Sequence, residues 1–295
     1  MIGETIYKNL KEKYNFNSIL FCPYKEEMFD SMRTVYETAL KDNVECALMP
    51  IPYWNLYHTL PVGLNIEFNG INFPDALNRR WDVIVIHYPY DNRNSITRPL
   101  IFTSTLKCFC DKLVLLPYAC VGDRDVYEHE VLLPYTQVIS LQVVETEKQK
   151  KQIEEIWKQH GIEGEVEAWG SAKFDERKIE IPQEWKEKAN GRNVILLQTS
   201  VVPYLQNANK LDEIEKFIDS TDDCILWRPH PLYVQTIKSI RPYELEKYFR
   251  IQNKADIIDE TKDYQNAFAF CDEMVSDGSS LDILFKSTHK PLKRL

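Results

Sequence analysis

Two cationic side chains stand directly after an apolar run in the C-terminal half of the chain. The tetrapeptide Arg228-Pro-His-Pro231 follows Cys224–Trp227, a run that predicts a buried strand. A guanidinium and an imidazole can together form charge-assisted hydrogen bonds to phosphate oxygens. The alternative for His230 is a rigid loop histidine that bonds only to the backbone. Because two cations end the same predicted strand, we favour a functional role for Arg228 and His230.

Small and hydroxyl-bearing residues follow two other apolar runs. One run ends in Leu197-Gln-Thr-Ser200, and another in Val275-Ser-Asp-Gly-Ser-Ser280, which leads into a helical segment from Leu281. Hydroxyls and unpaired N–H groups at a helix start can bind an anion, and a glycine permits the tight turn before it. The alternatives are N-capping serines and polar residues that merely end strands. The predicted diphosphate-binding residues are Arg228, Ser276, Gly278, Ser279, Ser280, Thr199 and Ser200.

A histidine ends an apolar run in the N-terminal half as well. His87 closes the predicted strand Asp82–His87 and precedes Tyr88-Pro-Tyr-Asp91. An imidazole with a pKa near 6.5 suits a general base that acts on a substrate hydroxyl. The alternative, of equal weight, is a histidine that hydrogen-bonds a loop carbonyl. Asp91 either orients His87 or caps a turn. The candidate catalytic residues are His87 and His230.

Motifs of several other enzyme classes are missing from the sequence. It contains no Walker A sequence, no GxGxxG, no HExxH and no GxSxG. Asp123-Arg-Asp125 has the form of a metal–diphosphate motif, but it opens a predicted helix, where acidic residues are favourable anyway. These absences argue against phosphate-loop NTPase, dinucleotide oxidoreductase, zinc protease and α/β-hydrolase chemistry.

Short apolar runs alternate with amphipathic segments along all 295 residues. Runs such as Val83–Ile86 and Val194–Leu197 are apolar on both faces, which is typical of parallel strands covered by helices. Between Gly170 and Arg192 the chain is rich in charge and has no apolar run, and a second series of strands and helices then begins. We therefore expect an α/β fold with two Rossmann-like domains, residues 1–170 and 171–295, whose parallel sheets face a cleft.

Composition restricts the partners and the compartment. With 36 Lys+Arg against 45 Asp+Glu, the net charge of −9 argues against nucleic acid as a partner. The seven cysteines are odd in number and form no CxxC pair, so we expect free thiols in a reducing compartment. The sequence has no apolar run near 18 residues and no signal-peptide pattern. We expect a cytoplasmic protein.

The motifs resemble those of a known family. Trp227-Arg-Pro-His-Pro231 and Val275-Ser-Asp-Gly-Ser-Ser280, together with Gly170-Ser-Ala-Lys-Phe-Asp175 and Ile86-His-Tyr-Pro-Tyr-Asp91, resemble segments of the CDP-glycerol:poly(glycerophosphate) glycerophosphotransferases. These are teichoic-acid primases and polymerases of bacterial cell walls, with a catalytic part of GT-B architecture. The resemblance spans Phe21 to Ser280, and the chain ends at Leu295, earlier than the family pattern, so the second domain is expected to be abbreviated.

The resemblance implies transfer of glycerol phosphate, or a similar alditol phosphate, from a CDP-activated donor to an acceptor hydroxyl in the synthesis of a cell-wall or surface polymer. Residues 1–170 would form the acceptor side and residues 171–295 the nucleotide-donor side. His230, Arg228, Ser279 and Ser280 would contact the donor phosphates. The family base stands in a Trp-His-Gly context, for which His87, between Ile86 and Tyr88, is the nearest match.

The same resemblance implies neither a metal requirement nor a cofactor. A lipid-linked or glycan acceptor implies weak peripheral contact with the inner face of the cell membrane. Two alternatives stay open. One is a nucleotide-sugar glycosyltransferase of the same fold, because a diphosphate site serves both reactions. The other is a non-catalytic nucleotide-binding paralogue, for which the early C-terminus is the reason.

Overall fold

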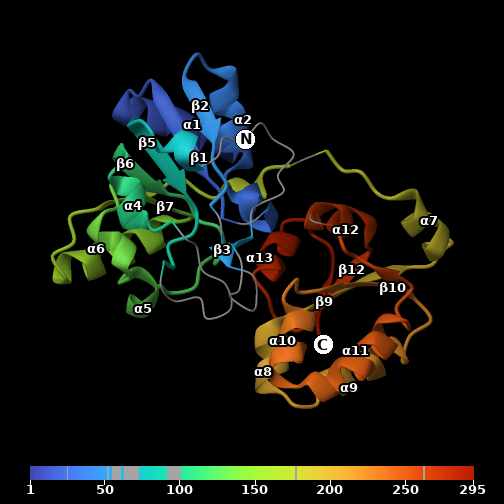
Figure 1. Ribbon diagram of the computed structural model, residues 1–295. Coiled ribbons are helices and arrows are strands. Elements are labelled where there is room, and N and C mark those ends of the chain that lie inside the picture. The colour runs from blue at the N-terminus through green and yellow to red at the C-terminus, as the bar shows by residue number, and fades with distance from the viewer. Residues whose placement is uncertain are drawn as a thin grey trace. The chain divides into compact units, whose positions relative to one another are not determined.

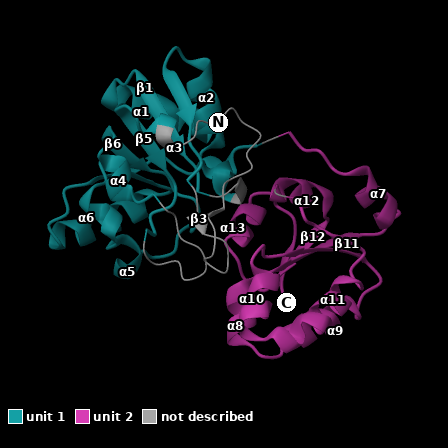
Figure 2. Cartoon of the chain, in the orientation of Figure 1, with its two compact units in different colours: residues 1–176 teal, residues 177–295 magenta. Residues whose placement is uncertain are grey.

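The computed structural model describes residues 1–24, 26–51, 53–54, 61–62, 73–91, 101–176, 178–261 and 263–295 (Figure 1). The chain divides into two compact units, Met1–Glu176 and Arg177–Leu295 (Figure 2). The sequence placed a domain boundary between residues 170 and 171, whereas residues 171–176 here belong to unit 1. Each unit contains one parallel sheet, so the predicted α/β class with two Rossmann-like sheets is confirmed.

Unit 1 is built around a six-stranded sheet in the order β2-β1-β5-β6-β7-β8, in which every neighbouring pair is parallel. A short antiparallel pair, β3-β4, lies outside this sheet. The elements in chain order are α1 (Ile2–Tyr14), β1 (Ser18–Cys22), η1 (Glu26–Ser31), α2 (Arg33–Lys41), β2 (Glu45–Leu48), β3 (Tyr53–Trp54), β4 (Pro61–Val62), α3 (Phe73–Ala76), β5 (Trp81–Ile86), α4 (Thr103–Lys107), β6 (Cys110–Leu115), α5 (Glu128–Val131), η2 (Pro134–Gln137), β7 (Leu141–Val144), α6 (Glu147–Gln159), β8 (Glu165–Ala168) and η3 (Ala172–Phe174).

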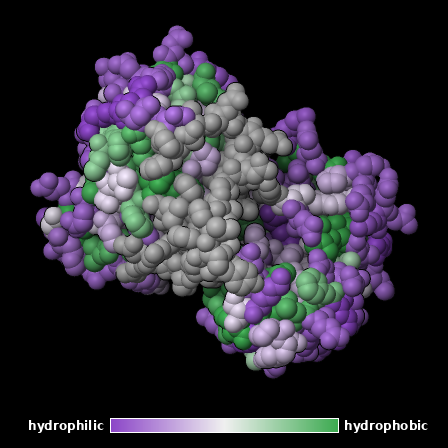
Figure 3. Space-filling view, viewed as in Figure 1, coloured by the Kyte–Doolittle hydropathy of each residue, from purple (hydrophilic) through white to green (hydrophobic). Residues whose placement is uncertain are grey.

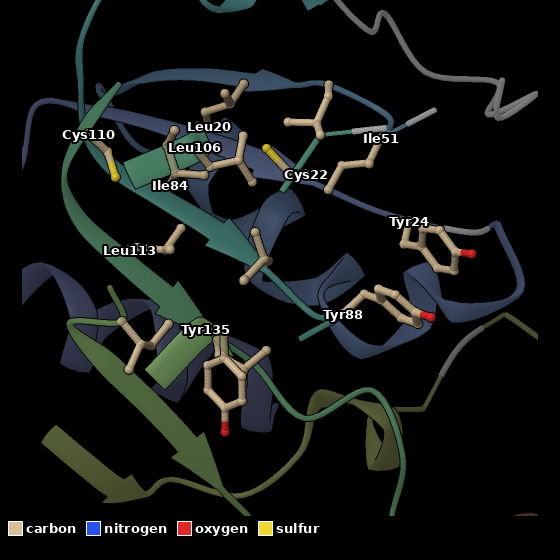
Figure 4. Packing of buried hydrophobic residues seen from close by; sticks show 14 of the residues in the cluster. Leu20, Cys22, Tyr24, Ile51, Ile84, Tyr88, Leu106, Cys110, Leu113 and Tyr135 are labelled. Atoms are coloured by element: carbon tan, nitrogen blue, oxygen red, sulfur yellow. The ribbon is translucent and has the colours of Figure 1, made fainter. Parts of the chain in front are cut away.

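The central strand β1 is buried along its whole length because helices cover both faces of the sheet. Along β1, Ile19 and Phe21 join the core that α1 and α2 complete. Leu20 and Cys22 alternate with them and join a second core, which includes Leu106 of α4 (Figure 4). Burial of one such side chain stabilises a fold by about 1.5–3 kcal/mol, which explains why a run apolar on both faces becomes a central strand.

The end of unit 1 is tied to its first helix. Asp175, which is buried, accepts hydrogen bonds from the N–H groups of Ile2 (2.5 Å) and Gly3 (2.8 Å) and from the hydroxyl of Thr34. These N–H groups lie in the first turn of α1, which has no intrahelical acceptor for them and favours a negative charge. A Cβ atom on Gly3 would lie 1.9 Å from Thr34 Oγ1, so the clamp requires glycine there.

Unit 2 contains a five-stranded sheet in the order β11-β10-β9-β12-β13, again with every neighbouring pair parallel. Trp227 of β10 is fully buried in a core with residues of α9, α10 and α11. The elements in chain order are α7 (Gln183–Ala189), β9 (Val194–Thr199), α8 (Val201–Gln206), α9 (Lys210–Ile218), β10 (Cys224–Pro229), α10 (Tyr233–Ile240), η4 (Pro242–Glu244), α11 (Leu245–Gln252), β11 (Ile257–Ile258), α12 (Tyr264–Phe270), β12 (Glu273–Ser276), α13 (Leu281–Lys286) and β13 (Leu292–Arg294).

Each strand order has a point at which its direction reverses. In unit 2 the chain runs from β9 outward to β10 and β11, and then returns to the other side of β9 to form β12. In unit 1 it runs from β1 to β2 and returns to form β5 on the other side of β1. Ligands of open α/β sheets bind outside the carboxyl ends of the strands at such a reversal. The carboxyl ends of β9 and β12 and those of β1 and β5 are therefore the edges at which this topology favours a ligand.

In the view of Figure 3, hydrophilic residues cover much of the described surface, with hydrophobic patches between them. None of the helices in the described part of the chain is long and apolar enough to span a membrane.

Candidate functional site

The carboxyl ends of β9 and β12 are joined by hydrogen bonds. The N–H group of Ser200, directly after β9, donates to both carboxylate oxygens of Asp277, directly after β12, over 2.9 and 3.1 Å. The N–H group of Asp277 donates in turn to the carbonyl oxygen of Gln198 over 3.2 Å. The reversal point of unit 2 thus has a carboxylate at its centre, a residue that the sequence analysis did not single out.

Asp277 titrates unusually high for an aspartate. Burial raises its pKa to about 6, although the Ser200 N–H group and the charge of Lys210 both act in the opposite direction. Lys210, at the start of α9, is itself buried, and its Nζ lies 2.9 Å from Glu213 Oε2. The edge of the sheet therefore holds a carboxylate that loses its charge in mildly acidic solution, with a lysine near it.

Two serines of the predicted phosphate-binding loop, Ser276 and Ser279, form hydrogen bonds within the loop and with the start of α13. Ser276 donates to Asp282 Oδ1 over 2.6 Å and accepts from the Gly278 N–H group over 3.1 Å. Ser279 accepts from the Leu281 N–H group over 3.1 Å. These contacts correspond to the capping alternative, and the φ angle of 107° at Gly278 explains the glycine in the turn.

Ser280 is the part of this loop that stays accessible. Its side chain is exposed, and in residues 263–295, as in the rest of the described chain, neither its N–H group nor that of Ser279 has a hydrogen-bond partner. Two adjacent N–H donors and a hydroxyl can bind one oxyanion. Of the four predicted loop residues, Ser279 and Ser280 retain the donors that an anion would need.

The two cations after β10 differ in their surroundings. The Arg228 guanidinium forms an ion pair with the fully buried carboxylate of Asp259 and donates to the carbonyl oxygen of Thr261 over 3.0 Å. Both partners follow β11, and β9 separates β10 from β12 in the sheet. Arg228 is thus bonded to residues that follow β11, the strand on the side of β10 opposite to β9. That Arg228 and Ser279 bind one diphosphate together stays a prediction.

His230, in contrast, lies exposed at the edge of the sheet. Its N–H group donates to the carbonyl oxygen of Thr199 over 2.9 Å, and its Nδ1 accepts from the Leu232 N–H group over 3.1 Å. Thr199 is buried and accepts from the indole N–H of Trp227 over 3.0 Å, which is a structural contact. Ser279, Ser280 and His230 therefore present polar groups at the edge, whereas Thr199, Ser200, Ser276 and Arg228 bond to structural partners within the unit.

The predicted base of unit 1 is completely buried. Nε2 of His87 accepts from the Tyr24 N–H group over 2.8 Å, and Nδ1 lies 2.8 Å from the Ser31 hydroxyl, which donates to the Met28 carbonyl oxygen. This network assigns the proton to Nδ1. Burial and the charge of Lys173 lower the pKa of His87 to about 3. The geometry supports the structural alternative, in which His87 joins the ends of β1 and β5.

Asp91 does not orient His87. Its carboxylate accepts from the N–H group of Thr103 over 3.1 Å and from the hydroxyl of the same residue over 2.6 Å. Asp91 thus serves the start of α4, in agreement with the capping alternative.

The comparisons with known proteins identify the fold. No family model and no curated protein sequence matches the chain. Among solved structures, it is similar to S. aureus MnaA with UDP, with a TM-score of 0.58, 11% identity, and coverage of 93% of this chain and 78% of that chain. A putative UDP-N-acetylglucosamine 2-epimerase from Listeria monocytogenes gives a TM-score of 0.55 at 10% identity, covering 95% of this chain and 79% of the other.

A wall teichoic acid polymerase, TagF, soaked with CDPG, gives a TM-score of 0.51 at 12% identity, with coverage of 98% of this chain and 73% of that chain. These neighbours are GT-B enzymes that include nucleotide-sugar epimerases and one teichoic acid polymerase. The fold of the present chain is therefore of the GT-B class. At these identities the likeness concerns the fold alone.

Proposed function

We propose that the protein is a GT-B transferase whose nucleoside-diphosphate donor binds at the carboxyl edge of the unit 2 sheet. The observation that carries the proposal is the set of polar groups that follow strands at the carboxyl edge of one sheet: the N–H groups of Ser279 and Ser280 and the Ser280 hydroxyl after β12, and the exposed imidazole of His230 after β10. Two further points support the proposal: ligands of open α/β sheets bind outside the carboxyl ends of the strands, and two structural neighbours were solved with UDP or CDPG.

We further propose that the donor is a CDP-activated alditol phosphate, with glycerol phosphate as the first candidate. This step rests on the motif resemblance and on the structural likeness to TagF. The reaction would be an in-line displacement in which an acceptor oxygen forms a bond to the β-phosphorus, the bond between that phosphorus and the bridging oxygen breaks, and CMP leaves. His230 and the two N–H groups would bind the phosphate oxygens on which negative charge develops.

The role of His87 as general base would require a change in its surroundings. Tyr24 and Ser31 occupy both ring nitrogens, and a group with a pKa of about 3 is a weak base at neutral pH. The acceptor proton is therefore not assigned to His87 in the arrangement described here.

A nucleotide-sugar enzyme is the second candidate function. It is favoured by the fold comparison, since the UDP-containing structure has a TM-score of 0.58 against 0.51 for TagF. The phosphate donors of unit 2 would serve a UDP-sugar equally well. The products separate the two candidates, because an alditol phosphotransferase releases CMP and a UDP-sugar transferase releases UDP.

The experiment compares binding and turnover of CDP-glycerol, CMP and UDP-N-acetylglucosamine. A nucleotide present at 100 times its Kd adds about 2.7 kcal/mol to apparent stability, so thermal shifts detect the donor. We expect His230→Ala to lower turnover about a hundredfold with little loss of stability, because the side chain is exposed. Ser220→Ala, which removes the hydroxyl after α9 that donates to the carbonyl oxygen of Phe217, is the matched control.

If His230→Ala turns over donor as fast as the wild type, the proposed donor phosphate site at His230 is excluded. Binding of a nucleotide without release of any product would favour the non-catalytic paralogue. Release of UDP from the sugar nucleotide, with CDP-glycerol left intact, would establish the second candidate.

A further inference from the structure

A cavity of about 130 Å³ lies within unit 1, where β5, β6 and β7 end. Its walls include Tyr90 after β5, Tyr118 after β6, Tyr135 of η2, and Gln142 and Glu145 from β7 and the turn after it. An engineered protein cavity of about 150 Å³ accepts a benzene molecule, so a space of this size suits one six-membered ring. The neighbouring positions of three parallel strand ends make it a natural place for a ligand.

The aromatic wall of the cavity is held in place by ring packing. Tyr90 and Tyr118 meet edge to face with ring centroids 5.9 Å apart, and Tyr88 lies 5.3 Å from Tyr90. Tyr88 is in turn stacked on Tyr24 at 3.9 Å (both residues are labelled in Figure 4). Such contacts fix the ring orientations, and a preformed aromatic face can pack against the C–H bonds of a ring-shaped ligand at low entropic cost.

The polar wall of the cavity accepts hydrogen bonds. The two carboxylate oxygens of Glu145 accept from the N–H groups of Val121 (2.8 Å) and Gly122 (3.1 Å). A carboxylate has about four acceptor sites, so two bonds leave capacity for ligand hydroxyls. The Tyr135 hydroxyl donates to Gln142 Oε1 over 2.6 Å, which fixes that amide with its nitrogen as the remaining donor. The cavity thus offers an acceptor and a donor near an aromatic face.

The charges around the cavity disfavour an anion. Arg124 is the cation among the lining residues of the cavity, and Glu130 binds it through both terminal nitrogens, over 3.1 and 2.8 Å. Lys173 acts on Glu145 from outside the lining, but its Nζ lies 3.3 Å from the carboxylate of the buried Asp30. A phosphate entering this space would meet the Glu145 carboxylate while both nearby cations already have acidic partners.

We propose that this cavity binds one uncharged sugar ring, with an apolar face of the ring against Tyr90 and Tyr118 and a hydroxyl donating to Glu145. The proposal rests on the proposed transferase function in one respect, because the ring would belong to the acceptor. The proposal restricts the class of acceptor, because a poly(glycerol phosphate) acceptor carries a negative charge on every unit and would be repelled by the Glu145 carboxylate. The acceptor end that enters unit 1 is therefore a saccharide.

The test measures binding of small probes to the full chain without any nucleotide. The probes are the methyl glycosides of glucose, galactose, mannose and N-acetylglucosamine, with glycerol 3-phosphate as the anionic probe and choline as the cationic probe. Saturation-transfer NMR detects such weak ligands, and we expect at least one glycoside to bind with a Kd in the millimolar range. Failure of every glycoside to bind at about 50 mM, or stronger binding of glycerol 3-phosphate or choline, would overturn the proposal.

Two variants connect the binding to the cavity. Ala119→Phe places a ring in the space that Ala119 lines, and we expect it to weaken glycoside binding at least about tenfold. Leu40→Phe, which enlarges an exposed side chain on α2, is the matched control. If Ala119→Phe fails to fold, Glu145→Gln keeps an acceptor oxygen but loses the charge-assisted bond, and a loss of about fivefold is expected. Unchanged glycoside binding in the folded variants contradicts the assignment.

This outcome is separable from that of the proposed function. Glycosides that bind a protein unable to bind any nucleotide would support the cavity and remove the donor site. Nucleotide binding without glycoside binding would support the donor site and overturn the assignment of the cavity.

Discussion

The burial of His87 leads to a quantitative prediction about acid stability. The folded protein holds this imidazole neutral with a pKa of about 3, whereas an unfolded chain has a value near 6.5. Between these two values the unfolded state binds more protons, so stability rises with pH and is lost on acidification. Linkage over this window gives a loss of about 2 kcal/mol from His87 alone between pH 7 and pH 5.

The perturbation is His87→Gln, which supplies an acceptor and a donor but does not titrate. It will lower stability at pH 7, because its hydrogen bonds to Tyr24 and Ser31 cannot match those of the ring. The informative quantity is the difference in the free energy of unfolding between pH 7 and pH 5, obtained from urea unfolding of the wild type and of His87→Gln. We expect the variant to lose about 2 kcal/mol less than the wild type on acidification.

His129→Gln, which removes an exposed histidine from the same unit, is the matched control. A direct reading comes from the ring nitrogen resonances of His87, which should keep their neutral pattern down to pH 5. An equal loss of stability in wild type and His87→Gln, or a titration of His87 near pH 6.5, would refute the reasoning. Either result would also return this residue to consideration as a general base.

Two further predictions concern unit 2. Asp277→Asn keeps an oxygen for the Ser200 N–H group and removes a carboxylate whose pKa is raised from 3.8 to about 6, so the full cost of its charge to stability applies above pH 6, and this cost fades as the pH falls toward 3.8. Allowing for partial solvent screening, we expect a gain of about 1 kcal/mol at pH 8 and about half of that at pH 5 in urea unfolding, and equal gains at both values would contradict this. Arg228→Met leaves the buried Asp259 unpaired, so we expect a loss of about 3–5 kcal/mol at pH 7, and a loss below about 1 kcal/mol would show that the ion pair is not structural.

The elements that depend on local pattern were predictable from the sequence. Runs such as Val83–Ile86 and Val194–Leu197 are central parallel strands, because residues apolar on both faces have no other stable place than between two helical layers. The carboxyl ends of β9, β10 and β12 carry the polar residues that drew attention. The alternation of strands and helices therefore sufficed for the fold class.

The features that the sequence did not reveal depend on contacts between distant residues. His87 is hydrogen-bonded to Tyr24, 63 residues earlier, and to Ser31, 56 residues earlier, and no local pattern reports such partners. Arg228 is paired with Asp259, 31 residues later, which the motif Arg-Pro-His-Pro does not reveal. Asp277 lies inside the recognised motif, but its raised pKa arises from burial, which only the folded sheet creates.

The bond between Asp175 and the first turn of α1 has a consequence for how the protein is made. The acceptor and its two N–H donors are 173 and 172 residues apart, so a ribosome must translate almost all of unit 1 before the opening helix can acquire its anchor. Until then Thr34 and the start of the chain lack the carboxylate that binds them both. A gene shortened to end at Gly170 would encode all six strands of the sheet but not Asp175, so the first turn of α1 would lack its carboxylate acceptor. A gene longer by six codons would encode Asp175 and end where unit 1 ends.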